Sequence, residues 1–384
     1  RLTTKPSRTT NAFKKRQKDS RVCTMMMIAS TIPRRSSALI QVSSKRLLTG
    51  GAGLGNVRDR MMAAEEELFQ HSTSPKTVSL IGAPMTYGQP FVGTDSGPKL
   101  LREGGLRSMM TALGWRVDDV GDINFEKIAS QANQASFPSA RNCGIVGAVN
   151  EHLANVVQEK IGSGRFPLLL GGDHSIGIGS LAGVLRNRPN TGVLWIDAHA
   201  DINIPDISES GNMHGMPIGM LMEGVSPDFS KLPGFDWLID GPRLRPDQIV
   251  YVGLRDVDGA ERSIIRKLGI PAFTMHDIDH HGIGKVMDMA LNHLLKDDSN
   301  RPLHLSYDID AVDPVLAPAT GTTVRGGLNF REAHFVAEAV AMSGNLASAD
   351  IVELNPTLSD GQGAKETVEL GLQIVTSMMG KSII

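Results

Sequence analysis

The stretch that decides the fold is Gly192-Val193-Leu194-Trp195-Ile196-Asp197-Ala198-His199-Ala200-Asp201, in which an unbroken apolar run ends in acids and a histidine. An apolar run without polar alternation is typical of a strand buried on both faces, as in a parallel sheet. Five further runs share the pattern, at residues 78–81, 167–170, 249–252, 303–306 and 351–352. Amphipathic stretches separate them and predict helices, at residues 99–113, 147–161, 260–268, 284–295, 330–342 and 365–379. The sequence therefore predicts an α/β fold whose mostly parallel sheet is covered by helices on both faces.

Charge and composition divide the 384 residues into a basic head and an acidic body. Residues 1–48 hold twelve Lys and Arg against one acid, Asp19, although the whole chain has a net charge of -2. We interpret residues 1–58 as an N-terminal extension, disordered or a transit peptide, because transit peptides are rich in Arg and Ser and poor in acids. Residues 59–76 form a connecting segment, and residues 77–384 form the catalytic domain. A mitochondrial location follows from the transit peptide, with the cytoplasm as the alternative.

Two classes of partner are disfavoured by composition. Aromatic residues make up only 4% of the chain, so side chains on which nucleic-acid bases could stack are scarce. The body is also acidic, which argues against binding of nucleic acid. No run of about 18 apolar residues occurs, which argues against a membrane span. Neither Cys23 nor Cys143 lies in a ligand-like spacing, and we expect Cys143 to be a packed core residue. The expected partner is therefore a small molecule, without nucleic acid or membrane.

Acids and histidines follow three of the predicted strands. The three motifs are Gly171-Gly172-Asp173-His174-Ser175, Asp197-Ala198-His199-Ala200-Asp201 and Asp308-Ile309-Asp310. In open parallel sheets, ligands bind beyond the carboxyl ends of the strands. Burying so many carboxylates without cations would be very costly, and no Lys or Arg lies within these motifs. A single Asp-x-His-x-Asp could equally be a turn cluster, but three such strand ends together predict a metal site.

The ligand types indicate which metal and what chemistry. Carboxylates and imidazoles without thiolates favour an ion such as Mn²⁺ over structural Zn²⁺. Four Asp and two His exceed the needs of one ion, which favours a pair of ions about 3.5–4 Å apart. Such a pair lowers the pKa of a bridging water and supplies hydroxide as the nucleophile. The sequence thus predicts a hydrolase with two metal ions.

Five strings together resemble the ureohydrolase family, which comprises arginases, agmatinases and related enzymes. They are GGDHS at 171–175, DAHADIN at 197–203, SGNMHGMP at 210–217, SYDIDAVDP at 306–314 and VELNP at 352–356. The resemblance runs from about residue 78 to residue 380. It implies a three-layer α/β/α fold with a central, mostly parallel eight-stranded sheet. It also implies two Mn²⁺ per subunit and a homo-oligomer, a trimer or hexamer.

The resemblance also assigns metal ligands. One Mn²⁺ would be held by His174, Asp197, Asp201 and Asp308. The other would be held by Asp197, His199, Asp308 and Asp310. Asp197 and Asp308 would then bridge the two ions.

Residues that bind the substrate are implied in the same way. By resemblance to arginases, three neutral donors of one loop would bind the substrate α-carboxylate: Asn203, Ser210 and Asn212. Ser208 in the same loop also counts as a substrate-binding residue. Asp258 and Glu261 would meet the α-amino group. Agmatine has no α-carboxylate and would leave these donors without a partner. The resemblance therefore favours hydrolysis of L-arginine to L-ornithine and urea over agmatinase or other guanidino-compound activity, which remain the alternatives.

Three residues are expected to carry the reaction by resemblance. Asp201 would orient the hydroxide that bridges the two Mn ions and pass its proton to the leaving amine. Glu353 would pair with the guanidinium and also counts as a substrate-binding residue. His214 would shuttle a proton to solvent, which suits a side chain with a near-neutral pKa. Thr322 matches a family position near the guanidinium.

Overall fold

The computed structural model describes residues 70–74 and 76–381, and a single sheet organises this range. Its eight strands are β1 (Thr77–Ala83), β2 (Arg116–Asp122), β3 (Phe166–Gly171), β4 (Gly192–Ile196), β5 (Ile249–Leu254), β6 (Ala272–Thr274), β7 (Leu303–Asp308) and β8 (Leu346–Val352). They pair in the order β2-β1-β3-β8-β7-β4-β5-β6, and every pairing is parallel. The central strands are buried throughout, as their unbroken apolar sequences predicted.

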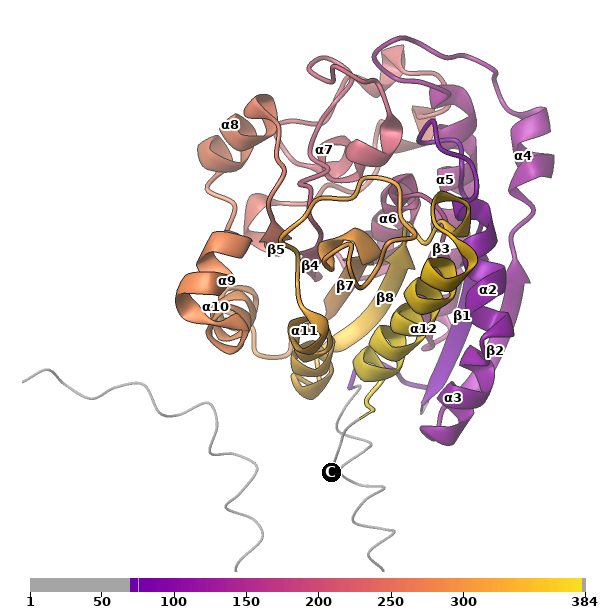
Figure 1. Cartoon of the computed structure of the whole chain (residues 1–384). Helices are drawn as coiled ribbons and strands as arrows, with labels where there is room; N and C mark the ends of the chain where they lie inside the picture. The colour runs from indigo at the N-terminus through magenta and orange to yellow at the C-terminus, as the bar shows by residue number, and fades with distance from the viewer. Residues whose placement is uncertain (1–69, 75, 382–384) are drawn as a thin grey trace, which may run out of the picture. The chain divides into compact units, whose positions relative to one another are not determined.

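Helices cover both faces of the sheet and give a three-layer α/β/α arrangement (Figure 1). One face carries α2 (Gly97–Glu103), α3 (Leu106–Ala112), α9 (Met275–His281), α10 (Ile283–Leu295), α11 (Phe330–Met342) and α12 (Gly361–Met378). The other carries α4 (Phe125–Gln131), α5 (Cys143–Gly162), α6 (Gly177–Asn187), α7 (Pro217–Leu221) and α8 (Gly259–Leu268). No helix of the described range is long and apolar enough to cross a bilayer.

Short 3-10 helices lie in the connections, several of them just beyond a strand. They are η2 (Thr94–Ser96), η3 (His174–Ile176), η4 (Met213–Gly215), η5 (Phe229–Lys231), η6 (Asp236–Leu238), η7 (Pro246–Gln248), η8 (Ile309–Ala311) and η9 (Pro356–Leu358). Side-chain caps start η3, η5, η8 and η9; at η3 Asp173 accepts from Ser175 N, and at η8 Asp308 accepts from Asp310 N. The chain therefore turns sharply where β3 and β7 end, and the turns carry predicted site residues.

The six strands expected from apolar runs are all present, and the structure adds two edge strands. β2 is polar and largely exposed, and β6 has only three residues, so neither gave an apolar run. The helix expected over residues 99–113 is two helices, because Gly105 takes a left-handed backbone with φ 93° between them. Cys143 is buried and free, as expected. The predictions for residues 1–58 and for most of 59–76 fall outside the described residues.

Strand register places the predicted ligands side by side. Ile196 of β4 is level with Tyr307 of β7, so the next residues along the two strands, Asp197 and Asp308, are neighbours. Asp308 is in turn level with Val352 of β8, the residue before Glu353. The carboxyl ends of β3, β8, β7 and β4 therefore meet at one edge of the sheet, where ligands bind in this class of fold.

Candidate active site

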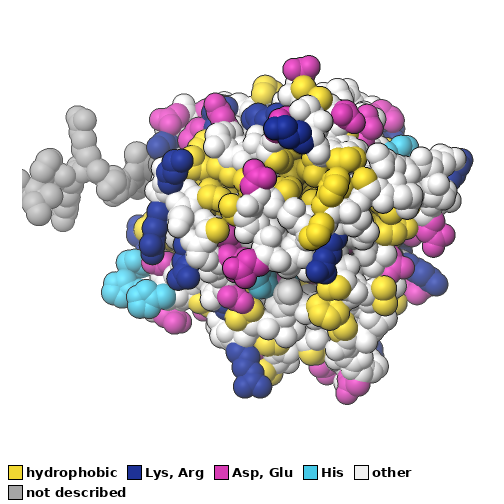
Figure 2. Space-filling model, turned by 90° about the horizontal axis from the view of Figure 1, so that it is seen from above, with side chains coloured by type: hydrophobic (Ala, Val, Ile, Leu, Met, Phe, Trp, Pro, Cys, Tyr) yellow, Lys and Arg dark blue, Asp and Glu magenta, His cyan; other side chains and the backbone are white. Residues whose placement is uncertain are grey.

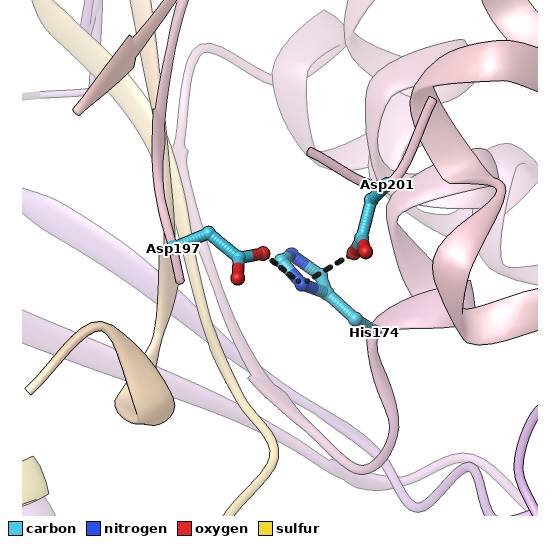
Figure 3. A group of neighbouring side chains, drawn as sticks. All are labelled: His174, Asp197 and Asp201. Atoms are coloured by element: carbon cyan, nitrogen blue, oxygen red, sulfur yellow. Dashed lines mark ion pairs between the residues drawn. The ribbon is translucent and has the colours of Figure 1, made fainter. Parts of the chain in front are cut away.

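The imidazole of His174 lies at the centre of one group of carboxylates. Its Nδ1 is 3.2 Å from Asp197 Oδ2, 3.1 Å from Asp201 Oδ2 and 3.1 Å from Asp308 Oδ2. Figure 3 shows His174 between Asp197 and Asp201, with the three side chains pointing toward one another. Three elements supply them: the turn after β3, the segment after β4, and the end of β7. The structure thus brings together four of the six predicted ligands in one group.

His199 forms a second group beside the first. Its Nδ1 is 3.1 Å from Asp310 Oδ2 and 3.4 Å from Asp197 Oδ1. Asp197 therefore turns one oxygen toward His174 and the other toward His199, and it belongs to both groups. A carboxylate shared in this way suits two cations close together.

The ring of His174 is held from two sides. Its Nε2 lies 2.9 Å from the hydroxyl of Ser306, so that Nδ1 faces the carboxylates. The indole of Trp195 stacks on the ring, with centroids 4.1 Å apart and planes within 5°. The same indole donates from Nε1 to Asp197 Oδ2 at 2.9 Å. Partners of this kind fix the direction of metal-ligating side chains.

The donor set fits divalent cations. Nδ1 of His174 is buried and close to three oxygens, yet none of these contacts has the geometry of a hydrogen bond. A buried ring nitrogen without a hydrogen bond is costly unless something else engages it. A cation among the oxygens and the imidazole would do so, and oxygen with imidazole suits ions of the Mn²⁺ type.

The pKa values of these groups indicate how strongly the negative charges interact. Burial and the charges of Asp310 and Asp197 raise the pKa of Asp308 well above its usual range. Burial and the charge of Asp197 raise the pKa of Asp201 to about 6. Burial opposes protonation of His199, but Asp310 and Asp197 raise its pKa to about 12. In the absence of cations, protons on these carboxylates and imidazoles therefore balance part of the negative charge of the cluster.

Two site residues have an uncommon backbone conformation. Asp201 has φ 50° and Glu353 has φ 66°, in the left-handed region that residues other than glycine rarely adopt. Strain of this kind persists only where the surrounding structure enforces it, and it concentrates at functional sites. Asp201 lies at the His174 group and Glu353 accepts from the backbone of His174, so both residues with this conformation are at the site.

Glu353 has three partners around its buried carboxylate. Oε1 accepts from the backbone N–H of His174 at 2.8 Å and lies 3.4 Å from His214 Nδ1. Oε2 accepts from Gln89 Nε2 at 2.7 Å. Burial opposes ionisation, but the hydrogen bond and charge of His214 hold the pKa of Glu353 below its usual range. Glu353 is thus a buried anion next to His174, one of the candidate metal ligands.

The loop after the Asp-x-His-x-Asp motif contacts the start of α8. Asn203 Nδ2 donates to Asp258 Oδ2 at 3.1 Å, while Asn203 Oδ1 is buried without a partner. Glu261 accepts from Ile202 N through Oε1 at 3.1 Å and from Asp258 N through Oε2 at 3.0 Å. Both oxygens of Glu261 are therefore engaged with the backbone, and Glu261 ties the two loops together.

Serine hydroxyls shape the second half of that loop. Ser208 Oγ accepts from Gly211 N at 3.0 Å, and Ser210 Oγ accepts from Asn212 N at 3.2 Å. Asn212 Oδ1 accepts from Arg141 Nη1 at 3.3 Å, which leaves the amide hydrogens of Asn212 to face another group. Gly211 has φ 69°, so the turn requires a residue without a side chain.

The 310–324 region closes the other side of the site. Thr322 Oγ1 donates to Asp310 Oδ2 at 3.2 Å. The guanidinium of Arg255 donates to the carbonyl oxygens of Asp310, Ala311 and Val324. Arg255 thus fixes the backbone of the turn that carries Asp310 without forming an ion pair with the Asp310 carboxylate. In Figure 2, acidic side chains and part of a histidine are visible together near the middle of the face seen from above.

Comparison with known proteins identifies the family once this geometry is in view. Residues 76–380 match the sequence profile of the arginase family. The chain belongs to the arginase family. Arginase family members are hydrolases of C–N bonds in linear amidines, and the chain is an enzyme of this class.

Three relatives illustrate the extent of the similarity. Arginase-1 of Mus musculus is 42% identical over 310 residues, which cover 80% of this chain and 94% of that protein. The protein named arginase-2, mitochondrial, of Rattus norvegicus is 41% identical over 313 residues, covering 80% of this chain and 86% of that protein. The crystal structure of Entamoeba histolytica arginase in complex with L-ornithine aligns with a TM-score of 0.70 at 32% identity, covering 80% of this chain and 99% of that chain. The arginase fold expected from the sequence is therefore confirmed.

Sequence reasoning did not identify several residues of this arginase-family site. Trp195 and Ser306 lie inside strands, and Ser306 also begins the matched string at 306–314, but neither was given a role. Gln89 and Arg141 occur in segments that were not matched to a motif. Arg255 stands three residues before Asp258, a predicted substrate-binding residue, but was itself given no role. For Gln89 a signal existed, because its loop follows the carboxyl end of β1, which lies beside β3 at the same edge of the sheet as the other four strand ends.

Proposed function

We propose that the chain hydrolyses L-arginine to L-ornithine and urea, using two Mn²⁺ ions held by the predicted ligands. The observation that carries the proposal is Asp197, whose two oxygens face two different imidazoles, each accompanied by further carboxylates. One ion would be held by the His174 group and the other by the His199 group. Asp308 would be the second shared ligand, since it lies beside Asp310 as well as His174. Two such ions, when bound, lower the pKa of water and so supply hydroxide at neutral pH.

Glu353 would position the substrate. Its buried anionic carboxylate is the natural partner of a guanidinium, and pairing of this kind fixes both distance and plane. In the present arrangement Glu353 contacts His214 at 3.4 Å. A guanidinium paired with Glu353 would replace His214 as the partner of this carboxylate. His214, half-buried near the surface, would then be free to exchange a proton with solvent.

Asp201 would handle the proton of the reacting water. The water oxygen adds to the guanidinium carbon, and the bond from that carbon to Nε of the substrate, the nitrogen that becomes the side-chain amine of ornithine, then breaks. Oδ2 of Asp201 lies at the His174 group, where it can hold the proton and deliver it to that nitrogen. A carboxylate held at this position can accept the proton of the water and release it to the leaving nitrogen, as a general base and then a general acid.

The amino-acid end of the substrate would lie on the 203–212 loop. Asn203, Ser210 and Asn212 offer neutral donors to the α-carboxylate, and Ser208 supports the turn. Asp258 would meet the α-amino group. Glu261 would act through Asp258, because its own oxygens are taken by backbone N–H groups. Thr322 would act near the guanidinium through Asp310.

The test compares urea release from L-arginine and from agmatine, with metal content measured on the same sample. Arginine turnover far above agmatine turnover, with about two ions bound per chain, is the expected result. Agmatine turnover equal to or above that of arginine would favour an agmatinase, the alternative function. Release of urea from neither compound by the metal-loaded protein would refute the proposal.

Assembly and location are separate parts of the proposal. We expect a homo-oligomer, a trimer or hexamer, which light scattering on the purified protein would test. The match to a relative named mitochondrial supports a mitochondrial location, with the cytoplasm as the alternative. Imaging the full chain fused to a fluorescent protein at its C-terminus would distinguish the two.

A further inference from the structure

Gln89 is the third buried polar group at Glu353, and nothing in the metal cluster accounts for it. It lies in the loop between β1 and η2, and its side chain is only 7% exposed. Its Nε2 is 2.7 Å from Glu353 Oε2. The amide NH2 donates and the carboxylate oxygen accepts, so it is the nitrogen end of the Gln89 amide that faces Glu353.

The other end of the amide has no partner. Oε1 of Gln89 is buried and makes no hydrogen bond with any described residue. Leaving a buried carbonyl unpaired costs about 1–3 kcal/mol, so such an atom calls for a ligand or another explanation. Gln89 therefore offers an acceptor beside the anion that we assign to the guanidinium.

The space next to this oxygen is kept open by a glycine. A Cβ built on Gly321 would lie 2.9 Å from Gln89 Oε1, 3.6 Å from a ring carbon of Phe91 and 3.9 Å from Glu353 Oε2. Gly321 is thus adjacent to both acceptors at once. Its φ is not in the left-handed region, so backbone conformation does not explain the glycine. A side chain there would enter the space that Gln89 and Glu353 share.

We propose that Gln89 is a specificity-determining residue that accepts an N–H of the substrate guanidinium through Oε1 while its Nε2 holds Glu353. The inference rests on the proposed function, in which Glu353 pairs with the guanidinium. A guanidinium has only donors, arranged in one plane, and Glu353 alone supplies acceptors on one side of it. The amide oxygen adds an acceptor for a terminal guanidinium nitrogen, and ornithine has no such nitrogen because its side chain ends at the primary ammonium.

The first experiment replaces Gln89 with methionine, which keeps the length of the side chain and removes both polar atoms. We expect kcat/KM for L-arginine to fall about ten- to hundredfold, which corresponds to a hydrogen bond to a charged group of about 1.5–3 kcal/mol. Inhibition by L-ornithine and the bound metal content should stay within about twofold of the parent. Gln134→Met is the matched control, because Gln134 bonds only to the carbonyls of Ala129 and Ala132.

A second variant, Gly321→Ala, tests the same space while Gln89 itself is kept, because the added methyl group would lie 2.9 Å from Gln89 Oε1 and would displace that amide oxygen. The added methyl group meets only side-chain atoms, so we expect the fold to persist. It should lower kcat/KM for arginine and spare ornithine inhibition, as Gln89→Met does. This variant keeps the proposal open to refutation if Gln89→Met does not fold.

The outcomes separate the two levels of the proposal. If the parent protein releases urea from arginine but both variants match it, the role of Gln89 is refuted and the proposed function stands. Equal losses for arginine and ornithine would also refute it, because they would show a structural role without guanidinium specificity. If the parent protein releases no urea from arginine, the proposed function fails first.

Discussion

Trp195→Phe is the sharpest test of how the metal cluster is built. Trp195 is fully buried in β4, stacks on His174 and donates its indole N–H to Asp197, the proposed shared ligand. Phenylalanine keeps an aromatic ring in the stack but removes that donor. Oδ2 of Asp197, the oxygen that faces His174, then loses the one side-chain hydrogen bond that fixes its direction.

The size of the effect follows from this contact. A hydrogen bond to a charged group is worth about 1.5–3 kcal/mol, and tenfold in affinity corresponds to about 1.4 kcal/mol. Loss of a partner that orients a metal ligand typically weakens metal binding about 10–100-fold. We therefore expect Trp195→Phe to raise the dissociation constant for Mn²⁺ by about that factor, measured by titration of the metal-free protein.

Trp115→Phe is the matched control. Trp115 is also buried, and its indole donates to the backbone oxygen of Met379, which is not a candidate ligand. Both variants lose the same atoms and a hydrogen bond, so both should lower the thermal midpoint of the metal-free protein. Only Trp195→Phe should weaken Mn²⁺ binding. Equal Mn²⁺ affinity in the two variants would refute the role given to Trp195.

Three further predictions concern the same site. His199→Asn should reduce bound metal from about two ions per chain to about one and depress turnover, by elemental analysis and urea assay; two retained ions would contradict the second group. The carboxylates around His174 and His199 raise the pKa of both imidazoles, although burial opposes this, so the metal-free protein carries protons there at neutral pH. Binding of Mn²⁺ must release these protons, so Mn²⁺ affinity should rise from pH 6 to pH 8. Calorimetry in buffers of different ionisation enthalpy should detect the proton release. If no protons are released, the two imidazoles are not protonated in the metal-free protein. Gly211→Ala should raise KM for arginine at least severalfold while leaving metal content unchanged, because the left-handed turn and the carbonyl of Pro138 leave no room for a methyl group; an unchanged KM would separate this turn from substrate binding.

Local sequence determined the strands and the ligand candidates. Unbroken apolar runs such as Gly192–Ile196 specify buried parallel strands, and the carboxyl ends of such strands share one edge of the sheet. Acids and histidines directly after these runs could therefore be placed together before any contact was known. The edge strands β2 and β6 could not be found in this way, because polarity and short length remove the periodic signal.

Tertiary structure decided how the candidates are used. That Asp197 faces the imidazole of His174 as well as that of His199 depends on the pairing of β3, β8, β7 and β4, because His174 follows β3 whereas Asp197 and His199 follow β4. The contact of Gln89 with Glu353 joins residues 264 positions apart, and no local pattern specifies it. Sequence fixes which groups stand at the ends of the strands, because strand formation and side-chain alternation are local properties. Tertiary packing alone decides which of those groups meet, since it sets the distances on which electrostatic interactions and hydrogen bonds depend.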